Sequence, residues 1–275
     1  MSLFRICRIA GNTFLEAVRQ KFFLFLALIA LGLLGSVLYF QRFDFGSSEL
    51  KFIADFGSGA IVFFGSILSI VMMAQLFFAE IENRTALTIL AKPVHRWEFL
   101  AGKFCGVAAL LGVFILLMII VLGAFLYYRE SQIVAQYAEL FQGRRIINYV
   151  GLFVFGWTQW LKYCVLISLT LFFASFSNTN LFSVVISFMV LIICQIQYVA
   201  IEVVTRMDPS WYTWAVEHVA LIFPNFQNYN LLVPMVFSAN AGVPWSLAGS
   251  VTLFSLVYVL VYLGLAVFSF RRREI

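Results

Sequence analysis

Charged side chains are scarce in this sequence: Asp, Glu, Lys and Arg make up 11% of its 275 residues, whereas 63% of the residues are hydrophobic. Soluble chains average about 25% charged and about 45–50% apolar residues. The remaining polar residues are too few to cover a water-facing surface. This composition excludes a soluble enzyme and a disordered chain, and it predicts an integral membrane protein.

Residue patterns for catalysis and metal binding are also missing. The four cysteines are dispersed without a Cys-x-x-Cys pair, and neither His-Glu-x-x-His nor Gly-x-Ser-x-Gly occurs. Gly102-Lys103 is followed by Phe104, so the spaced glycine and the Ser or Thr of a phosphate-binding loop are lacking. We therefore expect no catalytic residue, metal or cofactor in this chain, and no ATP hydrolysis by it.

What the sequence does contain is long apolar runs, each suited to a bilayer core about 30 Å thick. Four runs lack any charged residue or histidine, and two further runs are interrupted only by Lys162 or by uncharged polar residues. We predict six membrane-spanning helices in one permease domain covering residues 1–275. The spans are expected at about 22–40, 57–79, 104–128, 158–176, 181–199 and 246–270. The fourth and fifth spans are joined by a tight polar turn at 177–180.

The basic residues predict the orientation of these spans. Eleven of the 18 Lys and Arg residues fall on the side that holds both termini, and seven fall on the other side. By the positive-inside rule, both termini are expected in the cytoplasm of a multi-pass protein, taken to be in the bacterial inner membrane. The positive net charge is then a topology signal, so no nucleic-acid partner is expected, and membrane lipids surround the chain.

Residues 3–20 repeat polar side chains every three or four positions, which predicts an amphipathic helix at the membrane surface. It is either an anchor for the first span or a collar against a neighbouring subunit. On the outer side, Ser131 to Gln142 resembles a short interfacial helix. Residues 200–245 are aromatic and punctuated by prolines, and Asp208-Pro209 starts a helix there. Re-entrant or interfacial helices are expected in this outer segment.

The cytoplasmic loop at 80–103 is longer than a connection requires. Pro93 is expected to separate two short helices in it. Few ionisable groups fall near the midplane, and Lys162 is expected to extend toward the outer surface as an anchor rather than to relay protons. A membrane protein without coupling residues, and with a large polar loop, is expected to take its energy from a partner.

The loop also carries a family pattern. Glu80-x-Glu82 is followed by Thr85, by Lys92-Pro93-Val94-x-Arg96, and by Glu98 and Gly102-Lys103. This pattern resembles the permease subunits of ABC transporters of the ABC-2 family, although many relatives have a glycine near 83–85, where this chain has none. The six spans, the amphipathic helix and the re-entrant outer segment agree with the resemblance.

The resemblance implies the partners and the contact residues. The loop would hold a coupling helix that docks on an ATPase subunit, and a minor contact would involve Asn178 and Asn180. The implied complex has two permease chains, identical or homologous, and two ATPase subunits that bind ATP and magnesium. The implied residues of the main contact are Glu80, Glu82, Arg84, Thr85, Pro93 and Arg96.

We therefore predict a permease that exports an amphipathic or hydrophobic substrate. A non-transporting anchor or mechanotransmitting subunit, which recruits a cytoplasmic partner through the same loop, is the alternative. An intramembrane lipid transferase with its site near Glu202, Asp208, Glu217 and His218 is a third hypothesis.

Overall fold

The computed structural model of this chain describes residues 2–40, 49–82, 95–136, 146–205, 222–237 and 243–271. Within these ranges every regular element is a helix. This confirms the prediction of an all-α protein. The predicted helix at Asp208 lies outside the described residues, as do all residues of the loop between Glu82 and His95.

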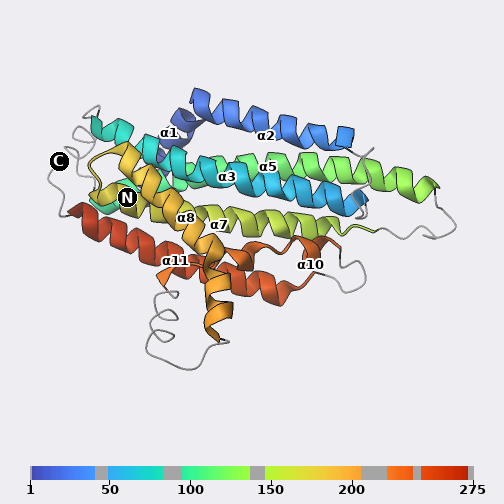
Figure 1. Cartoon of the computed structure of the whole chain (residues 1–275). Helices are drawn as coiled ribbons and strands as arrows, with labels where there is room; N and C mark the ends of the chain where they lie inside the picture. Colours follow the sequence, from blue (N-terminus) through green and yellow to red (C-terminus); the bar gives the residue numbers. More distant parts are fainter. Residues whose placement is uncertain are drawn as a thin grey trace.

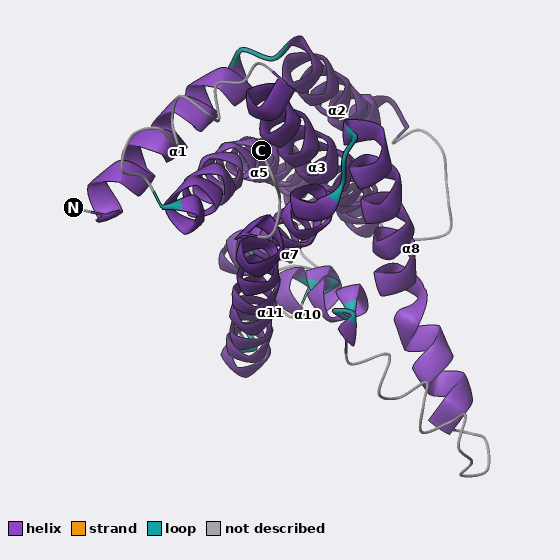
Figure 2. Ribbon diagram, turned by 90° about the vertical axis from the view of Figure 1, so that its left-hand side faces the viewer, coloured by secondary structure: helices purple, strands orange, loops and turns teal. Residues whose placement is uncertain are grey.

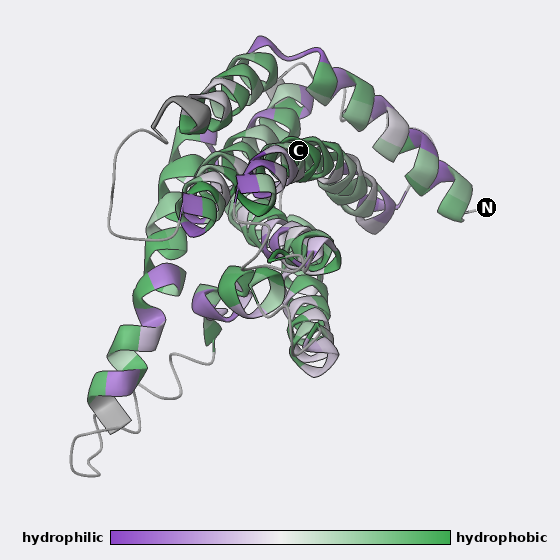
Figure 3. Ribbon diagram, turned by 90° about the vertical axis from the view of Figure 1, so that its right-hand side faces the viewer, coloured by the Kyte–Doolittle hydropathy of each residue, from purple (hydrophilic) through white to green (hydrophobic). Residues whose placement is uncertain are grey.

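Most of the chain folds into long apolar helices. They are α3 (Glu49–Glu82), α5 (Arg96–Gln136), α7 (Tyr149–Phe176), α8 (Asn180–Thr205) and α11 (Trp245–Arg271). Each is long and apolar enough to cross a membrane, and their ribbons are mostly hydrophobic (Figure 3). The amphipathic α1 (Ser2–Val18) and the apolar α2 (Lys21–Phe40) meet at a bend of 64° and form a sixth candidate span when taken together. The chain is therefore an integral membrane protein, as predicted.

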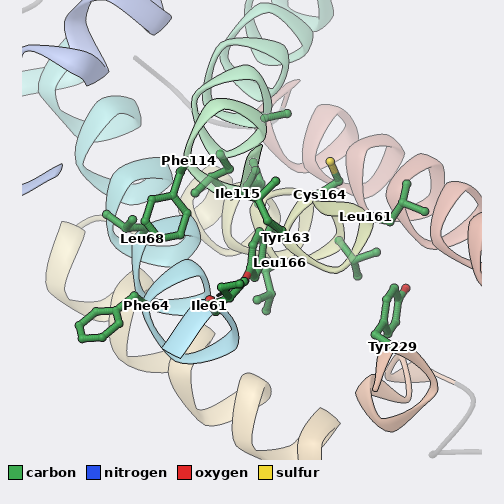
Figure 4. Close-up of a cluster of buried hydrophobic side chains, with 14 of the residues drawn as sticks. Ile61, Phe64, Leu68, Phe114, Ile115, Leu161, Tyr163, Cys164, Leu166 and Tyr229 are labelled. Atoms are coloured by element: carbon green, nitrogen blue, oxygen red, sulfur yellow. Dashed lines mark hydrogen bonds between the residues drawn. The ribbon is translucent and has the colours of Figure 1, made fainter. Parts of the chain in front are cut away.

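Helix α7 lies at the centre of the bundle. In its apolar stretch of 18 residues, 78% is buried, compared with 22% in the corresponding stretch of α8 and 28% in that of α11. Its polar side chains bond to main-chain carbonyls of the neighbouring helices. The Tyr163 hydroxyl donates to Ile61 O of α3 at 2.7 Å, and Trp160 Nε1 donates to Ala108 O of α5 at 2.9 Å. Figure 4 shows Tyr163 among the apolar side chains of this core. Buried polar groups in a membrane protein need such partners, so these bonds fix how α7 sits between α3 and α5.

The start of α7 is fixed by two polar side chains. Asn148 caps the helix, since its Oδ1 accepts a bond from Gly151 N at 3.2 Å. Glu130 of α5 is buried and accepts bonds from the main-chain nitrogens of Ile146 and Ile147 at 2.6 and 3.0 Å. These bonds hold residues 146 and 147 against α5. Helix α5 itself continues to Gln136, beyond the end expected for its span, through the first residues of the separate interfacial helix expected at 131–142; residues 137–142 lie outside the described part of the chain.

Part of the outer segment folds back against α7. It contains η1 (Phe226–Tyr229) and α10 (Leu232–Val236), and α10 lies between the diverging α8 and α11 in Figure 2. Gln159 Nε2 donates to Tyr229 O at 2.7 Å. Lys162 is 3% exposed, with its Nζ 5.1 Å from the centroid of the Phe226 ring. Lys162 was expected to extend to the outer surface, but in the structure it is buried, because the segment that contains η1 covers it.

The start of α1, the end of α11 and the turn between α7 and α8 lie at one end of the bundle (Figure 1). The same end is formed by the last turns of α3 and α11 and the first turns of α5. We call it the loop end, because residues 83–94 join α3 to α5 there. The far end carries Glu49, Gln136, Asn148 and Trp245.

Candidate functional site

At the loop end, α1 packs closely against α5. A Cβ atom added to Gly102 would lie 2.6 Å from Ile9 Cγ2, and one added to Gly106 would lie 2.8 Å from Ala10 O and 2.6 Å from Thr13 Cβ. Glycines four residues apart leave a groove in which a second helix backbone can approach. Gly102 and Gly106 therefore seat α1 directly on the part of α5 that follows the loop.

A buried lysine lies at the same place. Lys103 of α5 has a side chain with no exposed surface, and its Nζ lies 2.6 Å from Glu80 Oε1 of α3. The ammonium group also donates to Leu76 O of α3 at 3.0 Å and lies 3.9 Å from Glu16 Oε2 of α1. A buried charge is tolerated when it is paired and hydrogen-bonded. Lys103 thus joins three helices, two of which flank the loop.

The first turn of α5 is fixed by a second carboxylate. Glu98 is 1% exposed and its Oε2 accepts a bond from His95 N at 3.1 Å. A glutamate in the first turn that bonds back to the preceding backbone satisfies a free donor and complements the helix dipole. Arg5 of α1 lies 3.6 Å from the same oxygen. The contact adds Arg5 to the residues of α1 that lie at this end.

Arg96 connects the start of α5 to the end of α11. Its NH1 group donates to Phe270 O at 2.9 Å and to Arg271 O at 3.0 Å, and its guanidinium carbon lies 5.8 Å from the centroid of the Phe270 ring. The last carbonyls of a helix lack partners within it and favour a cation. Arg96 therefore caps α11.

Of the six predicted contact residues, the structure places the side chains of Glu80 and Arg96. They lie at the loop end but contact different groups, Glu80 on Lys103 and Arg96 on α11. Glu82 is the last residue of α3, and its side chain lies outside the described residues, as do Arg84, Thr85 and Pro93. Their contact with an ATPase subunit stays a prediction.

The turn between α7 and α8 is the other predicted contact. Ser177 N donates to Phe173 O at 3.1 Å and ends α7, and Ser177 Oγ donates to Thr179 O at 2.9 Å. Asn178 is exposed and Asn180, the first residue of α8, is half-buried. The turn lies at the loop end of the bundle (Figure 1).

Several residues at this end were not among the predicted site residues. Lys103, Glu98, Glu16 and Gly106 fix the flanks of the loop, and a signal for the glycines was present as Gly102-x-x-x-Gly106 within a spanning helix. Among the described residues, no three His, Cys, Asp or Glu side chains gather where they could hold a metal ion. The arrangement therefore binds helices to one another around a loop.

Comparisons with known proteins agree with this architecture. A family model described as "ABC-2 family transporter protein" matches residues 8–275. No curated protein matches the chain. The match covers α2 to α11 and residues 8–18 of α1, so it includes both flanks of the loop and the outer segment.

Proposed function

This chain belongs to the ABC-2 transporter family and is the permease of an ABC transporter, and we propose that it exports an amphipathic or hydrophobic substrate, driven by separate ATPase subunits. In the proposed complex, two permease chains, identical or homologous, work with two ATPase subunits, which bind the ATP and magnesium. Permeases of this family are the transmembrane component of the transporter, so ATP hydrolysis is carried out by the partner subunits.

The anchoring of the loop carries this proposal. The α3 flank of residues 83–94 is bound through Glu80 to Lys103, and the α5 flank is bound through Glu98 to Arg5 and through Arg96 to α11. A force applied to the loop then acts on α1, α3, α5 and α11 together. Packed helices linked in this way move as rigid bodies. An ATPase that docks on the loop, with Glu82, Arg84, Thr85 and Pro93 at the contact, would drive such a movement.

The proposed orientation places the loop end in the cytoplasm, within a bacterial inner membrane. Its support is the charge distribution, since the loop, the two termini and the first turns of α5 carry eleven of the 18 basic residues. Asn178 and Asn180 would then face the same ATPase as a minor second contact. The substrate class is supported by the spanning helices, which offer aromatic and aliphatic walls with few charges for an ion.

Copurification with ATPase activity tests the proposal. The tagged chain is extracted in mild detergent, and the ATPase subunits and their hydrolysis rate are measured for the unaltered chain and for Glu82→Ala. Asp55→Ala is the matched control, because it removes an exposed carboxylate from the other half of the same helix.

We expect ATPase subunits to copurify, and Glu82→Ala alone to release them or to uncouple their rate. If ATPase subunits bind but their rate is independent of the permease, the anchor hypothesis replaces transport. A chain that purifies without any ATPase contradicts the proposal.

A further inference from the structure

A cavity of about 500 Å³ lies between α8, η1 and α11, in the half of the bundle nearer the far end. Its walls are held in place by bonds from the bundle. The Tyr229 hydroxyl and Ser255 Oγ of α11 are 2.8 Å apart, and Gln159 of α7 binds Tyr229 O. These contacts hold η1 against α7 and α11, so that it lines the cavity together with α8 and α11, the two least buried of the five long helices.

The polar groups of this cavity are amides and hydroxyls. None of its described lining residues is charged, and Lys162 is not among them. Uncharged donors and acceptors set among apolar walls orient a ligand by hydrogen bonds without requiring a counter-charge. The polar lining residues are Gln197, Asn225, Gln227, Asn228, Tyr229, Ser250 and Tyr258.

A second cavity of about 430 Å³ continues the first along α11 and is lined largely by apolar side chains. The two share Phe254 and Tyr258, so they form one groove. The rings of Phe254 and Tyr258 stack at 6.5 Å, and those of Tyr258 and Tyr262 stack at 6.2 Å, which gives the groove an aromatic wall. From Leu247 to Leu265 the groove follows α11 for roughly 27 Å at the rise of an α-helix.

The groove has a direction relative to the membrane. Its polar part lies against the first turns of α11, beside the far end, and its apolar part runs from there toward the loop end. A lipid in the leaflet at the far end has the same orientation, with its head group at the interface and its chain pointing to the midplane. The groove therefore matches an amphiphile in both chemistry and direction.

We infer that this groove binds an amphiphile with an uncharged, hydrogen-bonding head group, such as a sugar or an amide, with one acyl chain laid along α11. The inference rests on the proposed transport function in one respect, since it makes this amphiphile the class of the exported substrate. The head group contacts the amides of Gln197, Gln227 and Asn228. The chain contacts Leu253, Val257, Val261 and Leu265.

Photocrosslinking to the purified full-length chain tests the binding. The probe is a monoglucosyl diacylglycerol with a diazirine on one acyl chain, and the comparison probe is a phosphatidylglycerol with the same labelled chain. We expect the glucosyl probe to label peptides from α11 and from residues 222–231 with saturation, and phosphatidylglycerol not to compete. Preferential labelling by phosphatidylglycerol, or labelling spread over all lipid-facing helices, overturns the inference.

Two pairs of variants locate the site. Gln197→Met removes a lining amide and should raise half-saturation about fivefold or more, whereas Gln195→Met makes the same change at an exposed position outside the groove. Val257→Trp fills the apolar part and should abolish labelling of α11, whereas Leu256→Trp points a tryptophan at lipid. Equal effects within either pair contradict the assignment.

The ATPase rate of the copurified complex separates the two proposals. If the glucosyl lipid stimulates ATP hydrolysis and Gln197→Met removes the stimulation, the bound amphiphile is a substrate. If the ATPase depends on the permease but the lipid neither binds nor stimulates it, the groove assignment fails and the transport function stands. Binding without any associated ATPase defeats the transport function and the assignment of the amphiphile as its substrate, and leaves the groove as a lipid site.

Discussion

Replacing Lys103 with methionine would leave the Glu80 carboxylate at the contact between α3 and α5 without the ammonium group that lies 2.6 Å from it. Methionine is also unbranched and only one heavy atom shorter than lysine, so the packing against α1 is largely retained. The bond to Leu76 O is lost as well. The effect of the substitution is therefore mainly electrostatic.

The magnitude follows from burial. Removing one partner of a buried ion pair costs about 3–5 kcal/mol, because the other charge stays buried and unpaired. The Lys103 side chain has no exposed surface and that of Glu80 is 17% exposed, which favours about 3 kcal/mol, the lower end of that range. The contact with Glu16 adds little, since that side chain is 44% exposed and the atoms are 3.9 Å apart.

A double-mutant cycle measures the pair itself. The unfolding of the purified chain by SDS in mixed micelles is followed by tryptophan fluorescence for Lys103→Met, for Glu80→Gln and for the double variant. Because Glu80→Gln removes the carboxylate that Lys103→Met deprives of its ammonium group, the double variant should be less destabilised than the sum of the two single variants, by about 1–2 kcal/mol. Strict additivity of the two substitutions would refute the reasoning.

Three further substitutions test the helix contacts, two of them in the same unfolding assay and the third by protease cleavage. Gly106→Ala should destabilise the chain by about 1–3 kcal/mol because the new methyl group meets the backbone and Thr13 of α1, whereas Gly59→Ala, which faces open space, should not. Tyr163→Phe should cost about 1 kcal/mol through the loss of one buried bond to a carbonyl of α3; an unchanged midpoint would exclude that bond as a stabilising contact. Gly151→Ala would place a methyl group 1.9 Å from a main-chain carbonyl of α10 and should displace that helix, which increased protease cleavage of residues 222–237 would report.

The presence of several long apolar helices could be predicted because apolar runs report the thickness of the bilayer core. The apolar runs do not show how far each helix continues beyond the bilayer core. The expected third span ended at Tyr128, whereas α5 continues to Gln136, and Arg129 there pairs with Glu49 of α3, far away in the sequence. The sequence shows both residues, but it does not show that their helices pack close enough for them to pair.

The candidate site could also be predicted only in part: its location could be predicted, but the contacts of its residues could not. The loop at 80–103 could be singled out from its length and polarity, and its family pattern named Glu80 and Arg96. The partners of these residues could not be found, because Lys103 reads as a basic residue placed for topology until α1 and α3 cover it. Lys162 was misjudged for a similar reason, since η1 returns over it from more than 60 residues away.

Site-specific photocrosslinking tests most directly whether the loop end receives the ATPase. A photoreactive benzoylphenylalanine is placed at Thr85 in the loop, or at Gln132 near the far end of α5, in cells that make the whole complex. We predict a crosslinked product between the chain and an ATP-binding subunit from position 85 and none from position 132. A crosslink from position 132, or from neither position while the complex stays intact, would contradict the account.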